Sequence, residues 1–164
     1  MTAEQYKKIS APFRTERRIK ILKITNKAVT ASGFAAYPIL LFYLYLTYTD
    51  KLFAAIAVPA SGFILLTVIR RKINRPRPYV TLDIQPLIPK EKKGNSMPSR
   101  HVFSMTIIAA AWFTVSPAVS AILMILSVVL AFIRIIGGIH YPSDVAAGAV
   151  CAILWAYAGF SLLL

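Results

Sequence analysis

Long stretches without a charged side chain dominate this sequence and restrict the folds available to it. Four of them cover residues 28–48, 52–69, 102–133 and 145–164, with 21, 18, 32 and 20 residues. An α-helix crosses the hydrocarbon core of a bilayer with about 20 apolar residues, and it satisfies all of its own backbone hydrogen bonds there. The sequence therefore predicts an all-α membrane protein.

The third stretch is too long for one crossing. At about 1.5 Å per residue, its 32 residues would form a helix of roughly 48 Å. Ser116 and Pro117 divide it into two arms, and we expect these helices to continue past the apolar limits to Ser99 and Ile136. The prediction is a polytopic bundle of about five transmembrane helices.

A basic segment precedes the first apolar stretch. Residues 1–27 place eight basic side chains among apolar ones, a pattern typical of an amphipathic helix on an anionic membrane surface. A solvated basic tail that only fixes orientation explains the charges equally well. We divide the chain into this N-terminal interfacial segment, residues 1–27, and a membrane domain, residues 28–164. No cleavable signal is recognisable.

Basic residues lie almost entirely on one side of the predicted bundle. Of the 19 Lys and Arg, 18 fall before residue 28, between residues 70 and 100, or at Arg134, and Lys51 lies on the other side. The positive-inside rule predicts an integral protein of a bacterial cytoplasmic membrane with the basic side in the cytoplasm. The formal net charge of +13 suits anionic lipid headgroups or a phosphorylated substrate. Nucleic acid is not expected beside spans this apolar.

Ionisable groups form three clusters on this basic side. They are residues 70–78 (RRKINRPRP), residues 98–101 (PSRH) and residues 134–144, which include Arg134, His140 and Asp144. Ionisable groups at the edge of a membrane core are costly, so their clustering indicates a functional site.

Phosphoryl transfer needs cationic donors around the phosphate oxygens, an in-line nucleophile and an acid for the departing oxygen. Arginine donates two hydrogen bonds to one phosphate and keeps its charge. Arg70, Arg77 and Arg134 are the candidates for this task. Ser99 and the backbone N–H groups of Arg100 and His101, at the start of a span, are expected to cap the phosphate.

Two histidines complete the predicted site. His140 has Asp144 four residues later, and a neutral imidazole can attack phosphorus when an acceptor holds its other ring nitrogen. His101 is favoured in its charged form beside a phosphate and is the candidate general acid.

These residues resemble the signature of the type 2 phosphatidic acid phosphatases, also called lipid phosphate phosphatases, which share their phosphate pocket with vanadium-dependent haloperoxidases. That signature reads K-x6-R-P, P-S-G-H and S-R-x5-H-x3-D. The chain has Arg70-x6-Arg77-Pro78, Pro98-Ser99-Arg100-His101 and Arg134-x5-His140-x3-Asp144. The resemblance covers residues 52–164. It implies metal-independent hydrolysis through a phosphohistidine, with His140 as nucleophile, Asp144 as its orienting partner and His101 as acid.

Three positions depart from that signature. Arg70 replaces lysine, Arg100 replaces glycine, and Ile133 replaces the serine before Arg134. Arg100 adds charge and bulk, which favours a diphosphate or narrows the pocket. The family commonly has six spans and an outward-facing site, in contrast to the five spans and the cytoplasmic orientation predicted here.

The remaining basic residues of this face receive no catalytic role. The segment 90–93 (KEKK) is interpreted as a solvated loop, with contact to lipid headgroups as the alternative. Arg71, Lys72 and Arg75 are interpreted as lipid-facing or topological charges. Ser99 has a second explanation as a helix N-cap.

The sequence thus predicts an integral membrane phosphatase of a lipid phosphomonoester or prenyl diphosphate, such as phosphatidic acid, phosphatidylglycerol phosphate or undecaprenyl diphosphate. The alternatives are a non-catalytic protein that binds anionic lipid and a relative of the vanadate-dependent peroxidases. His101, His140 and Asp144 would also make a known zinc ligand set. The surrounding arginines oppose a bound cation, so no metal and no cofactor are expected.

Overall fold

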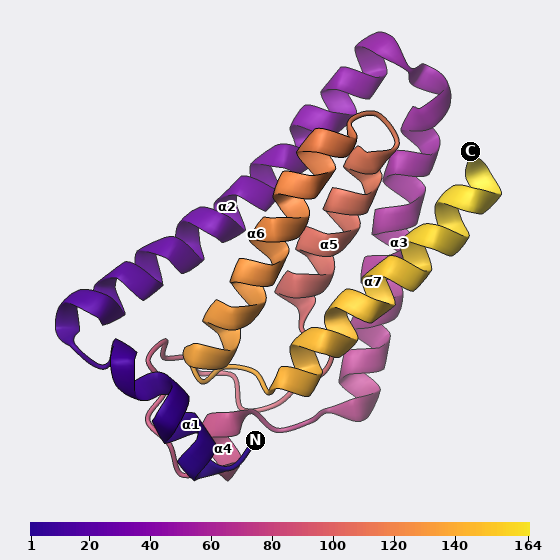
Figure 1. Ribbon diagram of the computed structural model, residues 1–164. Coiled ribbons are helices and arrows are strands. Elements are labelled where there is room, and N and C mark those ends of the chain that lie inside the picture. Colours follow the sequence, from indigo (N-terminus) through magenta and orange to yellow (C-terminus); the bar gives the residue numbers. More distant parts are fainter.

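The computed structural model describes all 164 residues, and its regular structure is entirely helical. The elements are α1 Ala3–Ser10, the 3-10 turn η1 Ala11–Phe13, α2 Glu16–Thr47, α3 Thr49–Ile73, α4 Pro78–Thr81, α5 Arg100–Phe113, α6 Pro117–Ile136 and α7 Pro142–Leu163. α2, α3, α5, α6 and α7 form a bundle, and α1 and α4 lie at one end of it (Figure 1). The predicted all-α class is confirmed.

The number of spans needs correction. Four helices, namely α2, α3, α6 and α7, are long and apolar enough to cross a membrane. The remaining predicted span, the first arm of the divided stretch, is α5, which has only 14 residues. At about 1.5 Å per residue it reaches roughly 21 Å, short of the 30 Å of a hydrocarbon core.

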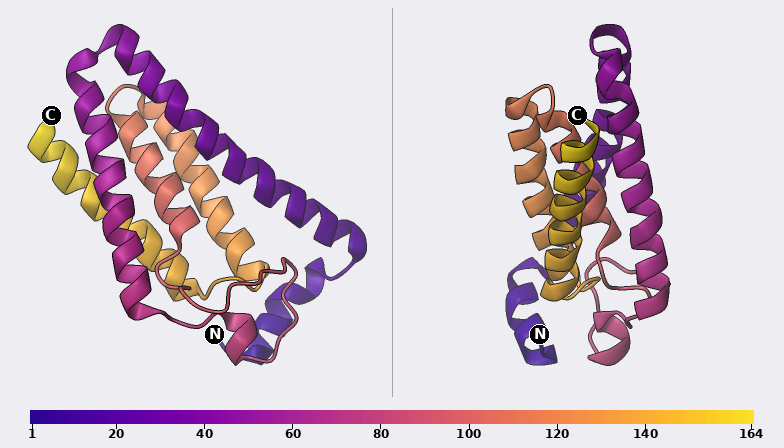
Figure 2. Two further views of the ribbon diagram at one scale, coloured as in Figure 1. Left: turned by 180° about the vertical axis from the view of Figure 1, so that it is seen from behind. Right: turned by 90° about the vertical axis from the view of Figure 1, so that its right-hand side faces the viewer.

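The short α5 occupies the centre of the bundle. It packs against α2, α3, α6 and α7, and the two views of Figure 2 show it enclosed by these longer helices. Nine of its 14 residues are buried, whereas only five of the 32 residues of α2 are. A helix that other helices shield from lipid does not need to match the bilayer thickness, so α5 can be both short and apolar.

The division of the third apolar stretch at Ser116 and Pro117 is confirmed. α5 ends at Phe113, and α6 begins at Pro117, where the Ser116 hydroxyl accepts a hydrogen bond from the Val119 N–H. As expected, the two helices extend past the uncharged run. Ser99 is the N-cap of α5, and Ile136 ends α6.

The N-terminal residues form two separate helical pieces. Only α1 stands apart, and its Tyr6 is fully buried, with the hydroxyl donating to the Gln85 carbonyl at 3.4 Å. α2 runs without interruption from Glu16 to Thr47. The basic segment 16–27 therefore forms the start of the same helix that carries the first apolar stretch, and this helix continues through residue 27.

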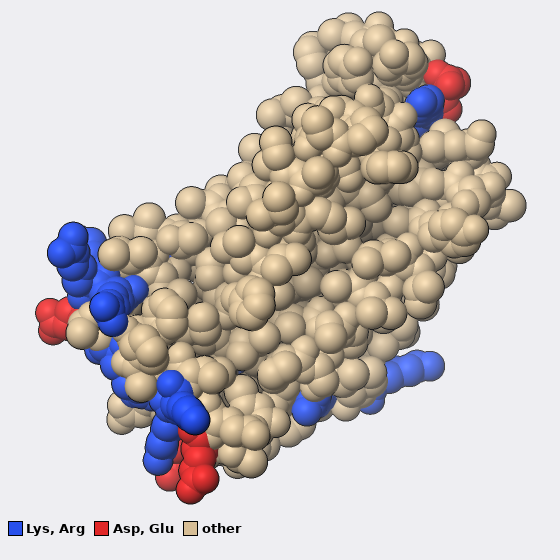
Figure 3. Space-filling view, in the orientation of Figure 1, with Lys and Arg blue, Asp and Glu red and all other residues tan.

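Charge and apolar surface are segregated on the outside of the bundle. Figure 3 shows Lys and Arg gathered at the end that carries α1 and α4, with a small acidic and basic group at the far end, where α3 begins with Asp50 and Lys51 nearby. Between the ends, large apolar side chains point outward, such as Phe34, Phe42 and Phe53, which are 66%, 66% and 69% exposed. An uncharged belt of this kind belongs in lipid, so the chain is an integral membrane protein.

Polar side chains tie the bundle together inside this belt. Thr106 of α5 and Ser127 of α6 share a hydrogen bond of 2.8 Å, and the Trp112 indole donates to the Ala36 carbonyl at 3.0 Å. Such bonds between membrane helices contribute about 0.6 kcal/mol each on average. They fix the rotation of α5 against its neighbours.

α7 approaches the chain just before α5 so closely that only glycine fits. A Cβ atom on Gly148 would lie 2.6 Å from the carbonyl oxygen and 3.3 Å from the nitrogen of Ser99. At the same place the Ser99 N–H donates to the Asp144 carbonyl oxygen at 2.8 Å. The start of α5 is therefore held directly on the first turns of α7.

We expect Gly148→Ala to destabilise the protein by about 1–3 kcal/mol, because the added methyl group would push on backbone atoms. Thermal unfolding in detergent measures the effect. Gly33→Ala is the matched control, since its Cβ would meet only the flexible end of Met105, at 2.7 Å from Sδ and Cε. Equal losses in the two variants would contradict the prediction.

Candidate active site

The turn between α6 and α7 presents His140. Gly138 adopts a φ of +73° there, which favours glycine. The N–H groups of Ile139 and His140 both donate to the Arg134 carbonyl, at 3.1 and 3.3 Å. The turn thus folds back onto the end of α6 and brings His140, only 2% exposed, beside Arg134.

The Asp144 carboxylate is fully buried, and both of its oxygens have partners. Oδ2 accepts from the Ser96 hydroxyl at 2.5 Å and from the Tyr141 N–H at 2.9 Å, and it lies 3.4 Å from His140 Nδ1. Oδ1 accepts from Arg75 Nη1 at 2.8 Å. Three segments therefore converge on one carboxylate: the segment after α3, the loop before α5 and the turn before α7.

Ser96 determines the tautomer of His140. A carboxylate only accepts hydrogen bonds, so the Ser96 hydroxyl must donate to Asp144. Its oxygen then remains free to accept from His140 Nδ1, which is 3.3 Å away. The proton of the neutral imidazole is thereby held on Nδ1, and Nε2 keeps its lone pair for chemistry.

Burial keeps this imidazole uncharged. It lowers the pKa of His140 to about 4, although the hydrogen bond with Asp144 acts in the opposite direction. At neutral pH His140 is thus a neutral base or nucleophile.

The three sequence clusters meet at one polar cavity of about 760 Å³. Six of the eight predicted site residues line it: Arg70, Arg77, Arg100, His101, Arg134 and His140. The other two, Ser99 and Asp144, are fully buried and do not line it. The structure thus assembles the predicted constellation from residues that are far apart in the sequence.

The buried arginines offer unpaired donors. Arg70 donates to the carbonyl groups of Pro98 and Asn95, and Arg77 Nη1 donates to the Ile139 carbonyl at 3.1 Å. The Nε atoms of Arg77 and Arg134 are buried without a protein partner. Such orphaned donors are rare in folded proteins, and both of these arginines line the polar cavity.

The backbone at the start of α5 offers donors for an anion, and the state of Ser99 differs from that of the two residues after it. In the first turn of a helix the N–H groups have no intrahelical partner, so those of Arg100 and His101 are available to an anion. The Ser99 N–H is already bonded to Asp144, and its buried hydroxyl has no partner. Phosphate binding by Ser99 stays a prediction.

Sequence reasoning missed two side chains that hold Asp144. Arg75, interpreted as a lipid-facing or topological charge, also donates to Ser143 Oγ at 2.8 Å, and its Cζ lies 4.2 Å from the centre of the Tyr141 ring. Ser96 lies outside all three motifs. Arg75 belongs to the same Arg-Pro repeat as Arg77, but nothing in that repeat indicates which arginine faces the carboxylate.

The segment 90–93 is an exposed loop, as the sequence indicates. Lys90, Glu91 and Lys92 also line the polar cavity, together with Arg71 of α3, which the sequence did not predict. The net positive charge at the cavity is therefore greater than the three motifs alone indicate.

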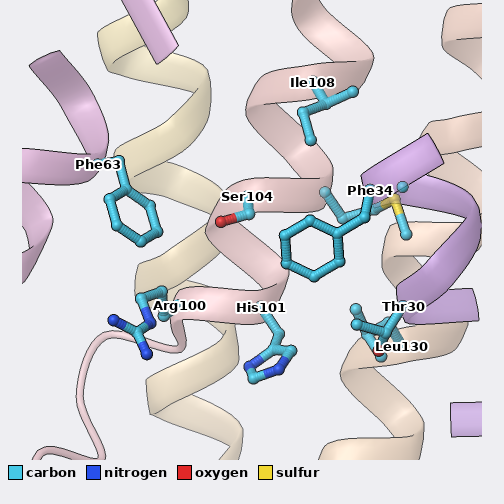
Figure 4. Close-up of a pocket in the computed structure, with 10 residues that line it drawn as sticks. Thr30, Phe34, Phe63, Arg100, His101, Ser104, Ile108 and Leu130 are labelled. Carbon is cyan, nitrogen blue, oxygen red and sulfur yellow. The ribbon is translucent and has the colours of Figure 1, made fainter. Parts of the chain in front are cut away.

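An apolar pocket of about 210 Å³ adjoins the polar cavity. Its walls come from α2, α3, α5 and α6 and include Phe34, Phe63, Met105, Ile108 and Leu130. Arg100 and His101 line both spaces. In Figure 4 they lie at one end of this pocket, with Phe34 and Phe63 on either side of it. Polar and apolar space thus meet at the first turn of α5.

The side chains do not form a metal cluster. No group of three His, Cys, Asp or Glu residues is arranged to hold an ion. The Asp144 carboxylate is engaged by Arg75 and Ser96 behind His140. The zinc alternative for His101, His140 and Asp144 therefore has no ligand set here.

The sequence profile of the PAP2 superfamily matches residues 51–163. The chain belongs to the PAP2 superfamily. This confirms the resemblance that the three motifs indicated.

Solved PAP2 structures share the fold. The crystal structure of LpxE from Aquifex aeolicus is similar with a TM-score of 0.77 and 23% identity, over 98% of this chain and 94% of that one. A transmembrane PAP2-type phosphatidylglycerolphosphate phosphatase from Bacillus subtilis gives 0.65 and 19%, over 96% and 91%. A comparison with curated proteins gives no match. At these identities the likeness concerns the fold alone.

Arg75→Gln tests whether Arg75 positions Asp144 within this PAP2 site. The buried carboxylate would lose its cationic partner, and because Arg75 is itself 32% exposed, solvent moderates the loss. We expect kcat for phosphate release to fall about 10- to 100-fold while KM changes little. Lys72→Gln removes a neighbouring exposed charge and should leave kcat unchanged. A kcat equal to wild type in Arg75→Gln would contradict the positioning role.

His140 is expected to stay neutral down to about pH 4, since burial lowers its pKa to that value. In the unfolded chain a histidine titrates near pH 6.5, so unfolding takes up a proton below that pH. The stability that depends on neutral His140 is then lost as the pH falls from about 6.5 towards 4. NMR titration of ¹⁵N-labelled histidine, assigned with a His101→Gln variant, measures this directly. Titration near pH 6.5 would show that the environment does not favour the neutral form.

Proposed function

We propose that the protein is a membrane lipid phosphatase that works through a phosphohistidine at His140. One observation carries the proposal. His140 has its Nδ1 held by Ser96 and Asp144, and it lines a polar cavity together with Arg77 and Arg134, whose buried Nε atoms have no protein partner. A positioned nucleophile beside unsatisfied cationic donors suits a phosphate ester better than any neutral substrate.

The first step transfers the phosphoryl group to the enzyme. Arg70, Arg77 and Arg134 bind the phosphate oxygens, and His140 Nε2 forms a bond to phosphorus as the bond to the leaving oxygen breaks. Asp144, through Ser96, stabilises the positive charge that develops on the imidazole.

His101 protonates the leaving oxygen. It lines the cavity among arginines, and the only carboxylate in that lining is Glu91. A bound phosphate brings about −1.5 to −2 charges into this space, which favours the imidazolium form. Substrate binding therefore creates the acid that the reaction needs.

The second step regenerates the enzyme. Neutral His101 removes a proton from water as the water oxygen attacks phosphorus, and the bond from phosphorus to His140 Nε2 breaks. Inorganic phosphate leaves through the polar cavity. No metal ion and no cofactor take part in this scheme.

Two observations support a lipid as the substrate. The apolar pocket shares Arg100 and His101 with the polar cavity, so a hydrocarbon chain and its phosphate can be bound at once. Four helices can span the membrane. Phosphatidic acid, phosphatidylglycerol phosphate and undecaprenyl diphosphate are all compatible substrates. The basic charge at this end of the bundle favours a cytoplasmic active site by the positive-inside rule.

Two other functions use the same residues. A protein that binds anionic headgroups without turnover would need the arginines but not the held tautomer of His140. A vanadate-dependent peroxidase would place vanadate among the arginines, but neither an apolar pocket nor membrane spans serve that reaction. The held tautomer of His140 argues against the binding protein, and the apolar pocket and membrane spans argue against the peroxidase. These features favour the phosphatase.

The decisive measurement is phosphate release by the purified protein in detergent with excess chelator, from these three lipids. We expect His140→Ala to lose activity more than about a thousandfold, as removal of a nucleophile does elsewhere, while headgroup binding persists. Activity that persists in His140→Ala would refute the nucleophile, and activity lost with chelator would indicate a metal enzyme. Binding without any turnover in wild type would favour the binding role.

A further inference from the structure

The polar cavity holds more positive charge than one phosphate can neutralise. Seven cationic side chains line it, against the single acid Glu91; they are Arg70, Arg71, Arg77, Lys90, Lys92, Arg100 and Arg134. A phosphomonoester carries about −1.5 to −2 charges. Most of the positive charge would remain unbalanced with such a ligand bound.

The seven cations fall into two groups by depth. Arg70, Arg77 and Arg134 are buried, at 8%, 6% and 2% exposed, and belong to the scissile phosphate beside His140. The outer group consists of Arg71, Lys90 and Lys92, which are exposed, and the half-buried Arg100. None of these four forms a salt bridge within the protein.

Lys90 is an exposed residue whose ammonium group is affected by the cavity. Desolvation of this group, and then the nearby charges of Arg134 and Arg77, lower its pKa. An additional anion near the outer group would relieve this repulsion, because opposite charge within a few ångströms favours the charged forms.

The position of Arg100 indicates where in the cavity this additional anion would bind. Arg100 lines both the polar cavity and the apolar pocket together with His101, the proposed acid. It therefore lies on the side from which the leaving group departs. Its guanidinium donates no hydrogen bond to the protein and rests 5.4 Å from the centre of the Phe63 ring. All of its donors are thus available to a ligand at the border between the polar cavity and the apolar pocket.

We propose that the leaving group of the substrate itself carries a negative charge, which Arg100 binds. The preferred substrates are then lipids with a second phosphate beyond the scissile one, rather than a simple phosphomonoester such as phosphatidic acid. A cavity of about 760 Å³ has room for such a headgroup. This inference rests on the proposed phosphatase function and narrows its substrate class.

Farnesyl diphosphate and farnesyl phosphate test it, because they share one chain and differ by one phosphate. We expect wild type to show a kcat/KM about tenfold or more higher on the diphosphate, and Arg100→Gln to lose most of that preference. A comparison of the kcat/KM values for short-chain phosphatidylglycerol phosphate and phosphatidic acid tells whether the second phosphate must be bonded directly to the scissile phosphate or can be separated from it. Lys23→Gln, which removes a charge from α2 outside the cavity, should keep the preference.

No preference in wild type, or an equal loss on both farnesyl substrates in Arg100→Gln, would overturn the proposal. The second result would mean that Arg100 binds the scissile phosphate. A preference that Arg100→Gln abolishes would support it.

A binding measurement separates this proposal from the phosphatase function. Methylenediphosphonate and methylphosphonate need no turnover, and a ligand that binds the native state raises Tm. We expect the diphosphonate to raise Tm more in wild type, and the difference to disappear in Arg100→Gln but not in Lys23→Gln. Equal shifts in wild type would overturn the proposal even if the protein is a phosphatase. A difference without any hydrolysis would leave the two-anion site standing and refute the enzyme.

Discussion

The hydrogen bonds of the Asp144 carboxylate are the interaction on which the site depends. Asp144 is the one carboxylate among the buried charged groups, which otherwise are Arg70, Arg77 and Arg134. It joins the segment after α3, the loop before α5 and the start of α7 through Arg75, Ser96 and Tyr141. Loss of its charge would leave several donors unsatisfied inside the protein. The same contacts orient His140, so the fold of the loops and the tautomer of this imidazole have one cause.

The sequence was sufficient for the fold class and for the grouping of the site. Uncharged stretches predict helices in lipid because the bilayer leaves so few alternatives. The spacing of His140 and Asp144 around the start of α7, and the charges clustered at span ends, predicted that the three motifs would meet, and six of the eight residues do line one cavity. The roles assigned to them stay predictions.

What the sequence did not reveal depends on irregular chain and on packing. Arg75 and Ser96 act from segments without periodicity, where spacing does not say which way a side chain points. α5 was counted as a membrane span because hydropathy cannot distinguish a helix surrounded by lipid from one surrounded by other helices. Lys90 and Lys92 have the composition of a solvated loop, and only the path of that loop brings them over the cavity.

The contact of Gly148 with Ser99 has a consequence for how such a protein can diversify. It makes the start of α5 and the first turns of α7 one rigid piece, so His101 and Asp144 keep a constant separation. The outer cations Arg71, Lys90 and Lys92 come from the end of α3 and from a loop, outside that piece. Substitutions there can adapt the protein to a new headgroup while the separation of His101 and Asp144 is preserved. Recognition and chemistry are thus open to separate selection during evolution.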